Sequence, residues 1–349
     1  MSDLRGGLIG CGFFARNHLR AWGEVQGAHL AAVCDPDPAR AEAFATEAGT
    51  ASVFTDPAEM LRVGGLDFVD IVTPPATHRA LVELAANHRT HVICQKPLAP
   101  SLDDARAMVA ACHAAGVRLM VHENFRWQTP MRALRDAVTE LGPLFYGRIY
   151  WRTAFDVYHD QPYLAEDARF ILADLGVHLL DLARFLFGEA GSVYCQTQRV
   201  NPRIRGEDVA TVMLRMGSGA TCLVELSYAS RLENDPFPQT LLELEGAHGT
   251  VALDRDFQLT LVTERGVSKR SVAPAPLTWG SPLMLHIQES VVRIQQHWVD
   301  CLRTGREPET SGTDNLGTLG LVEAAYASAT VGEVVRVGPA PISGIDAGR

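Results

Sequence analysis

Several features are missing from this sequence of 349 residues, and each absence argues against a class of function. No apolar run approaches the ~18 residues that a membrane-spanning helix needs, so we expect no membrane partner. Positive charge is in deficit: 31 Lys and Arg against 41 Asp and Glu give a formal charge of −10, which disfavours nucleic acid as a partner. The first residues, Met1 to Arg5, also lack the basic and apolar segments of an export signal.

Closely spaced cysteines are missing too. The seven cysteines are scattered along the chain, and none forms a C-x-x-C motif. This spacing indicates neither a zinc site nor a disulfide framework, so we expect reduced thiols and a cytoplasmic protein. Hydrophobic residues make up 47% and charged residues 21%, which is typical of a globular chain with enough core for two domains.

The first third of the chain alternates short apolar runs with helical patterns. Continuous apolar strands separated by helices predict a parallel sheet that is covered on both faces. We expect strands at 4–9, 29–34, 68–73, 91–94 and 117–121, and helices at 15–22, 38–48, 76–87 and 102–115.

Beyond this region the pattern changes to longer strands with partial alternation of apolar and polar residues, which predicts a mostly antiparallel sheet. The turns at 217–219 and 246–249 indicate hairpins. We expect strands at 144–153, 192–200, 208–216, 220–229 and 239–245, and helices at 285–304 and 314–331. The predicted domains are therefore an α/β domain over 1–122 and an α+β domain over 123–349.

The stretch from Gly10 to Ala15 fits the G-x-G-x-x-G/A pattern of a dinucleotide-binding turn. Gly10 permits the tight turn from strand to helix, Gly12 lets the backbone approach a pyrophosphate, and a small Ala15 allows close packing. The following helix offers free N–H groups to phosphate. We expect Phe13 and Phe14, within this turn, to contact the cofactor as well; the alternative is an ordinary corner.

Asp35 strengthens the dinucleotide interpretation. It follows the second expected strand, 35 − 15 = 20 residues after Ala15, where a carboxylate can accept hydrogen bonds from ribose hydroxyls. The same charge repels a 2′-phosphate, so NAD is favoured over NADP. Arg40 is a candidate cofactor contact that would suit NADP instead. The alternative for Asp35 is that it caps the helix that starts near Pro38.

Two loops follow the next strands at the edge where the cofactor is expected. Thr73, Pro74 and His78 lie after the third strand as candidate cofactor contacts, although His78 also suits a helix N-terminus without such a role. Gln95 and Lys96 end the fourth strand. An ammonium at position 96 can polarise a substrate oxygen and help to place the nicotinamide, whereas a surface lysine is the plainer interpretation.

Asp174 and His178 form the second informative pattern. On an α-helix, positions 174, 178 and 181 share one face, so a carboxylate lies one turn from an imidazole. His178 would exchange a proton with a hydroxyl while Asp174 orients it. A zinc site and a buried structural pair are the alternatives; no third ligand is identifiable, so we predict no metal.

Two further segments are dense in hydrogen-bonding and aromatic groups. The segment 122–128 suits either a sugar site or an interdomain hinge, and the segment 156–169 shows no clear periodicity, as functional loops often do. The candidate sugar contacts are Asn124, which also faces the expected cofactor site, together with Arg126, Trp127, Asp156, Tyr163 and Arg169.

These motifs together resemble the Gfo/Idh/MocA family of oxidoreductases. The resemblance rests on the glycine turn followed by His18, the Thr73–His78 segment, Gln95-Lys96-Pro97 and the Asp174–Asp181 segment, and it covers nearly the whole chain. The segments 6–14 and 122–127 are similar to a sugar-oxidising branch that includes D-apiose dehydrogenases.

The resemblance implies a Rossmann domain and a second domain with an open, mostly antiparallel sheet that often mediates oligomers. It implies that the catalytic Lys, Asp and His of the family are Lys96, Asp174 and His178. The sequence departs from the family at Gln95, where Glu usually precedes Lys-Pro, which puts cofactor positioning in question.

We therefore expect an NAD-dependent dehydrogenase that oxidises a hydroxyl of a sugar or polyol, such as D-apiose to its lactone, and forms a homodimer or homotetramer through the second sheet. One alternative is a lyase or glycosidase that cycles a bound NAD. Another is a sensor that binds NAD without turnover, which has no need for a proton relay.

Overall fold

The computed structural model describes residues 2–50 and 52–338, and contacts within the chain divide it into two units. The first unit contains the chain up to Trp127 together with Leu277–Gly280 and Ile287–Leu316, and the second contains the remainder. The division at 122/123 stays a prediction. Unlike the predicted domains, the two units are discontinuous in sequence, because residues after 276 belong in part to the first unit. Residues 339–349 of the predicted second domain lie outside the described residues.

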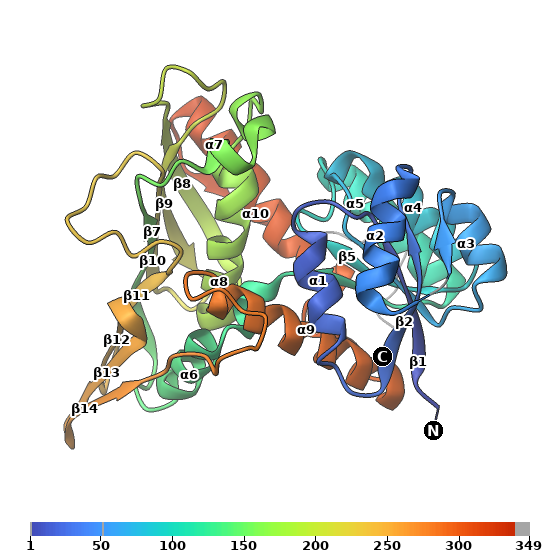
Figure 1. Cartoon of the computed structure of the whole chain (residues 1–349). Helices are drawn as coiled ribbons and strands as arrows, with labels where there is room; N and C mark the ends of the chain where they lie inside the picture. Colours follow the sequence, from blue (N-terminus) through green and yellow to red (C-terminus); the bar gives the residue numbers. More distant parts are fainter. Residues whose placement is uncertain (1, 51, 339–349) are drawn as a thin grey trace. The chain divides into compact units, whose positions relative to one another are not determined.

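The first unit is built on a parallel sheet (Figure 1). In the described residues its six strands have the order β3-β2-β1-β4-β5-β6, which is the strand order of a dinucleotide-binding Rossmann fold. The strands are β1 (Leu4–Ile9), β2 (Ala28–Cys34), β3 (Val53–Phe54), β4 (Phe68–Ile71), β5 (His91–Gln95) and β6 (Leu119–His122). The helices between them are α1 (Ala15–Trp22), α2 (Pro38–Ala48), α3 (Pro57–Val63), α4 (Pro75–Asn87) and α5 (Leu102–Ala115).

Local capping explains where several of these helices begin. Asp37 accepts hydrogen bonds from the N–H groups of Ala39 and Arg40, and Pro38 occupies the first position of α2. Ser101 caps α5 by accepting from the N–H of Asp104. The expected strands and helices of this region are confirmed within a few residues, whereas the short β3 and α3 carried no clear periodicity.

The core of the first unit includes a helix from the far end of the sequence. Helix α9 (Leu285–Thr304) contributes Trp298, which is fully buried and meets the ring of Phe68 edge-on at 6.3 Å. Phe68 lies on β4, so the sheet is packed against a segment more than two hundred residues away in sequence. The sequence pattern located this helix and did not assign it to the first core.

The second unit is built on a wide mixed sheet. In the described residues its nine strands have the order β14-β13-β12-β11-β7-β10-β9-β8-β15, and the β7–β10 pair alone is parallel. The strands are β7 (Leu144–Arg152), β8 (Ala190–Gln198), β9 (Val209–Met216), β10 (Thr221–Ser227), β11 (Leu241–Gly246), β12 (Gly249–Asp254), β13 (Gln258–Thr263), β14 (Gly266–Ser271) and β15 (Val335–Arg336). Both predicted hairpins are confirmed, because β9 pairs with β10 and β11 with β12.

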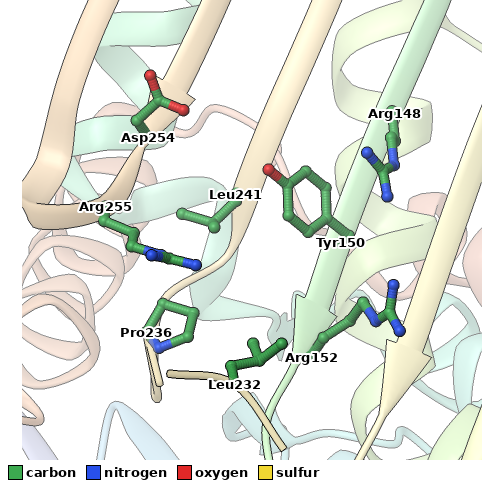
Figure 2. Close-up of a pocket in the computed structure, with 8 residues that line it drawn as sticks. All are labelled: Arg148, Tyr150, Arg152, Leu232, Pro236, Leu241, Asp254 and Arg255. Carbon is green, nitrogen blue, oxygen red and sulfur yellow. The ribbon is translucent and has the colours of Figure 1, made fainter. Parts of the chain in front are cut away.

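Helices cover one face of this sheet, and α8 (Val177–Phe187) packs against β7 and β10. Ile149 and Trp151 of β7 point to this covered face and are buried. The alternate residues of β7 point to the other face, where a pocket of about 450 Å³ lies. Figure 2 shows Arg148, Tyr150 and Arg152 projecting from β7 into this region. The sheet therefore keeps one face open.

The remaining helices are short or lie near the chain end. They are α6 (Thr129–Val138), α7 (Val157–Asp160) and α10 (Gly312–Val331), with short 3₁₀ turns at Asn124–Trp127, Pro162–Ala165 and Arg255–Phe257. No helix within residues 2–50 and 52–338 combines the length and apolar character that a membrane crossing requires.

Candidate active site

The carboxyl ends of the parallel strands bring the first group of predicted residues to one edge of the sheet. Gly10 follows β1, Asp35 follows β2, Thr73 follows β4 and Lys96 follows β5. The strand order reverses between β1 and β4, and ligands of open α/β sheets bind beside such a switch point. This edge is therefore where the fold is expected to receive a cofactor.

The glycine turn has the properties that its spacing predicts. Gly10 has a φ of +97°, and a Cβ added there would lie 2.5 Å from the carbonyl oxygen of Val72. A Cβ added at Gly12 would meet no atom within 4 Å, so open space adjoins this backbone. Helix α1 has no side-chain cap at Phe14, which leaves its first N–H groups available to an anion. Phe13 is largely exposed.

Asp35 holds the glycine turn to the second strand. Its Oδ2 accepts a hydrogen bond from the N–H of Cys11 at 2.8 Å, and its Oδ1 accepts from the N–H of Asp37 at 2.9 Å. Because Asp37 caps α2, the alternative that Asp35 caps this helix is wrong. Burial, followed by the charge of Asp35, raises the pKa of Cys11 to about 12. A carboxylate has about four acceptor sites, so ribose hydroxyls can still bind Asp35.

Arg40 lies on the surface of α2, where its Nε is 3.3 Å from Oδ2 of Asp37. This exposed pair gives Arg40 a local partner. A cofactor contact by Arg40 stays a prediction.

His78 joins two of the loops at this edge. Its ring is fully buried, with Nε2 2.8 Å from the carbonyl oxygen of Thr73 and Nδ1 3.0 Å from that of Leu98. Burial lowers the pKa of His78, and the backbone hydrogen bonds oppose this effect. His78 thus fixes the Thr73–Pro74 loop against the turn that follows Lys96, and a direct contact with the cofactor stays a prediction.

Gln95 is part of a buried hydrogen-bonded chain that sequence reasoning missed. Its side chain contacts both the N–H of Lys96 and the ring of His18, and His18 in turn contacts Asp70 on β4. Two signals were present in the sequence. His18 belongs to the glycine-turn motif, and Asp70 interrupts an otherwise apolar strand, where a charged residue requires partners.

Three predicted sugar contacts lie at the end of the first unit and have partners there. Asn124 donates to Oγ of Ser290 at 2.7 Å, and Arg126 pairs with Asp314 at 3.0 Å. The ring of Trp127 packs against that of His297, with a centroid distance of 4.3 Å and an angle of 37° between the ring planes. These contacts agree with the structural interpretation of the segment, and the sugar contacts stay predictions.

In the second unit, Asp174 and His178 belong to two different helical forms. Residues Leu172–Gly176 form a π-helix, and α8 begins at Val177. The expectation of one continuous α-helix is therefore wrong. The wider turn of a π-helix changes the angle between positions 174 and 178, and such turns are frequent at functional sites. Asp181, on the face predicted with them, is buried and accepts from Oγ1 of Thr318.

A buried glutamate on another segment makes hydrogen bonds to the backbone around this π-turn. Glu207 accepts hydrogen bonds from the N–H groups of Phe170 and Leu172 and from the hydroxyl of Tyr326. The Tyr326 oxygen also accepts from the N–H of Ala173 at 3.2 Å. Neither Glu207 nor Tyr326 was predicted, because nothing in their local sequence points to residues 35 or more positions away.

The surroundings of Asp174 are acidic and partly apolar. Burial, followed by the charge of Asp174, raises the pKa values of Asp167 and Tyr228. Arg169 lies over the ring of Tyr326 at 3.9 Å and pairs with Glu323. Asp156 and Tyr163 are exposed, and Tyr163 donates to the side chain of Gln161. The predicted sugar contacts of these three residues stay predictions.

The described residues hold no cluster of three or more His, Cys, Asp or Glu that suits a metal ion. All seven cysteines are free and buried. The residues predicted to carry the chemistry are the glycine turn, Asp35 and Lys96 in the first unit, and Asp174 and His178 in the second.

Both parts of the chain are similar to known protein families. Residues 4–123 match the family described as "Oxidoreductase family, NAD-binding Rossmann fold", and residues 131–252 match the "GFO/IDH/MocA C-terminal domain".

Individual relatives match over nearly the full length. D-apiose dehydrogenase from Rhizobium rhizogenes is 50% identical over 97% of this chain and 99% of its own. D-apiose dehydrogenase from Paraburkholderia graminis is 53% identical over 96% of this chain and 90% of its own. A crystal structure of an oxidoreductase from Agrobacterium radiobacter, in complex with NAD+, L-tartaric acid and magnesium, has a TM-score of 0.95 and 49% identity, and covers 96% of this chain and 99% of that one.

Proposed function

Because the chain belongs to the Gfo/Idh/MocA family of NAD-dependent oxidoreductases, we propose that it oxidises D-apiose, or a closely similar sugar, at the anomeric carbon. The observation that carries this proposal is the identity of 50% and 53% to two D-apiose dehydrogenases over almost the whole chain. Loss of two hydrogens from a cyclic sugar hemiacetal gives a lactone, so the product would be an aldonolactone. Neither a redox-cycling lyase nor a sensor has support from these relatives.

The residues of the first unit suit NAD. The open backbone at Gly12 and the uncapped start of α1 would receive the pyrophosphate, and Asp35 would bind the adenosine ribose. When bound, NAD supplies the hydride acceptor. A carboxylate at position 35 repels a 2′-phosphate, so NADP is the poorer cofactor.

We propose that Lys96 and His178 act on the oxygen of the sugar. His178 would take the hydroxyl proton and Asp174 would orient the imidazole, while the ammonium of Lys96 stabilises the developing negative charge. The choice between lysine and arginine along this chain favours a specific role for Lys96. Lys96 and Lys269 are the sole lysines in a sequence whose Lys and Arg total 31, so arginine serves at every other cationic position.

Lysine and arginine differ in ways that matter here. An ammonium is a compact point charge on a flexible stem, whereas a guanidinium is a broad planar fork that cannot give up its proton. The lysine at the end of β5, in a chain that otherwise uses arginine, therefore suits a site where a compact cation must fit beside a single substrate oxygen.

The experiment measures NADH formation by absorbance with NAD or NADP against D-apiose and a panel of pentoses, hexoses, inositols and sugar acids. We expect the highest kcat/KM with D-apiose and NAD, with one NADH formed for each sugar oxidised. Equal activity on all sugars, or a product without NADH, would contradict the proposal.

Two substitutions test the proposed roles. Lys96→Met and His178→Ala should each lower kcat by about 10²–10⁴-fold, the usual value of acid–base assistance, while NAD still binds. Lys269→Met and His113→Ala, at exposed positions on β14 and α5, are the matched controls and should keep full turnover. Unchanged turnover in the Lys96 and His178 variants would show that the roles are assigned incorrectly.

We also propose that the open face of the second sheet forms a homodimer or homotetramer in the cytoplasm. Support comes from partly exposed apolar side chains such as Met213 of β9, which is in register with Leu223 of β10 and, across β10, with Arg148 of β7. Figure 2 shows Arg148 on this face. The free, buried cysteines suit a reducing compartment. Sedimentation should give an oligomer that Met213→Glu weakens; a monomer at micromolar concentration would contradict this proposal.

A further inference from the structure

A buried chain of hydrogen bonds runs through the first unit and ends at the peptide N–H of Lys96. Trp22 Nε1 and His18 Nδ1 each lie 2.8 Å from Oδ2 of Asp70. His18 Nε2 lies 3.0 Å from Nε2 of Gln95, and Oε1 of Gln95 accepts from the N–H of Lys96 at 2.7 Å. His18 and Asp70 are fully buried, and 8% of Gln95 is exposed.

The groups at the two ends of this chain fix its direction. The backbone N–H of Lys96 is a donor, so the atom of Gln95 that faces it is the oxygen, and the amide nitrogen must face His18. The indole N–H of Trp22 is also a donor, so Oδ2 of Asp70 is an acceptor. His18 therefore accepts from Gln95 at Nε2 and donates to Asp70 from Nδ1, as a neutral imidazole.

We propose that Gln95 is a positioning residue that fixes the backbone at Lys96, and that its amide matches the lone pair that the buried His18 ring presents to it. The role in catalysis rests on the proposed function of Lys96. The proposed direction of the hydrogen bonds does not rest on that function, because it follows from the contacts alone.

A carboxylate at position 95 does not fit this arrangement. One oxygen can accept from the N–H of Lys96, but the other then faces the lone pair of His18 Nε2, so the pair must take up a proton. Reversing the ring does not relieve this conflict. With the ring proton on Nε2 instead, the lone pair of Nδ1 would face Oδ2 of Asp70, which accepts from the Trp22 N–H and has no hydrogen to donate.

Other titratable groups surround the chain and are common to any variant at position 95. The ring of His122 on β6 lies 4.1 Å from that of His18, and Cys94 on β5 is close enough to Asp70 for that charge to raise its pKa, after burial. Gln295 on α9 approaches Asp70 at 3.5 Å and is uncharged. A difference in pH dependence between the wild type and a position-95 variant therefore reports on the proton shared by residues 18 and 95.

The test compares unfolding of the wild type with Gln95→Glu, Gln95→Leu and Gln26→Glu between pH 6 and 9. Folded Gln95→Glu holds one proton that its unfolded chain releases above about pH 6.5. Its unfolding constant relative to wild type should therefore rise with pH, by up to about tenfold per pH unit. Gln95→Leu loses the same contacts at every pH, and Gln26→Glu adds an exposed carboxylate. The unfolding constant of each of these two variants, relative to wild type, should therefore stay constant with pH.

A constant ratio for Gln95→Glu would overturn the proposal. If that variant fails to fold, ¹⁵N spectra of the histidine rings in the wild-type protein provide the second measurement, with His18 identified by the signals that His18→Gln removes. We expect a proton on Nδ1 and none on Nε2; a proton on Nε2 would also overturn the proposal.

Activity separates this proposal from the proposed function. With D-apiose and NAD, kcat of Gln95→Leu should fall below that of the wild type while NADH still binds, because the Lys96 N–H loses its acceptor, and Gln26→Glu should match the wild type. A wild-type protein without dehydrogenase activity would refute the proposed function, and the unfolding and ¹⁵N measurements would still decide the direction of the chain. An unchanged kcat in Gln95→Leu would refute the positioning role.

Discussion

His286 should make the stability of this protein sensitive to acid. Its ring is buried in the second unit beside Phe257, with Nε2 2.9 Å from the carbonyl oxygen of Pro238. Burial lowers the pKa of His286 from 6.5 to about 4, and the hydrogen bond to Pro238 opposes this shift.

The sign of the effect follows from the protons bound in each state. Between pH 6.5 and pH 4 the unfolded chain binds a proton at His286 that the folded chain does not, so the free energy of unfolding falls as the pH falls. A shift of about 2.5 pKa units corresponds to about 3 kcal/mol, which is lost across this window and is fully present above pH 6.5.

The assay is urea unfolding of the wild type, His286→Gln and His286→Leu at intervals from pH 7.5 to pH 4. Glutamine can still donate to Pro238 and does not titrate, so the wild type should lose about 3 kcal/mol relative to it as the pH falls. His286→Leu should show the same relative trend with lower stability throughout, by about 1 kcal/mol for the unpaired carbonyl. Parallel curves for wild type and both variants would refute the reasoning, because the other histidines are common to all three.

Two further predictions concern the cofactor turn and the π-turn. Gly10→Ala should weaken NADH binding at least about tenfold in a fluorescence titration, because the positive φ costs about 1–2 kcal/mol and the new Cβ collides with the Val72 carbonyl. Gly49→Ala, with positive φ but no neighbour within 4 Å, should keep wild-type binding. Tyr326→Phe should cost about 1–3 kcal/mol in urea unfolding and lower kcat more than it changes NADH affinity, because Glu207 loses its phenolic donor under the π-turn. Equal losses in both glycine variants, or an unchanged kcat in Tyr326→Phe, would contradict these two explanations.

The local sequence was sufficient to predict most of the first sheet. Its parallel strands are buried on both faces, so they appear as continuous apolar runs that glycine, proline and polar caps separate. The positions of the glycine turn and Asp35 at the ends of β1 and β2 were predictable for the same reason, since they depend on short spacings along one strand, turn and helix. The β12–β14 region carried weaker signals, because its strands are short and partly exposed and resemble surface loops.

The segment from 172 to 187 shows where periodicity misleads. Its leucines repeat as on an α-helix, yet the first five residues form a π-helix. The hydrogen bonds that favour this form come from Glu207 and Tyr326, which lie on distant segments. Local propensity does not contain that information, so the mutual orientation of Asp174 and His178 was not predictable.

The sequence by itself determined the strand and helix pattern, the dinucleotide turn and the presence of Lys96 at a strand end, because each depends on neighbours within about one βαβ unit. Tertiary structure alone decided that helix α9 completes the first core and that Gln95 meets His18 and Asp70. Those contacts join residues 52 and 77 positions apart in the chain. A hydrogen bond between buried groups depends on distance in space, and the fold sets that distance.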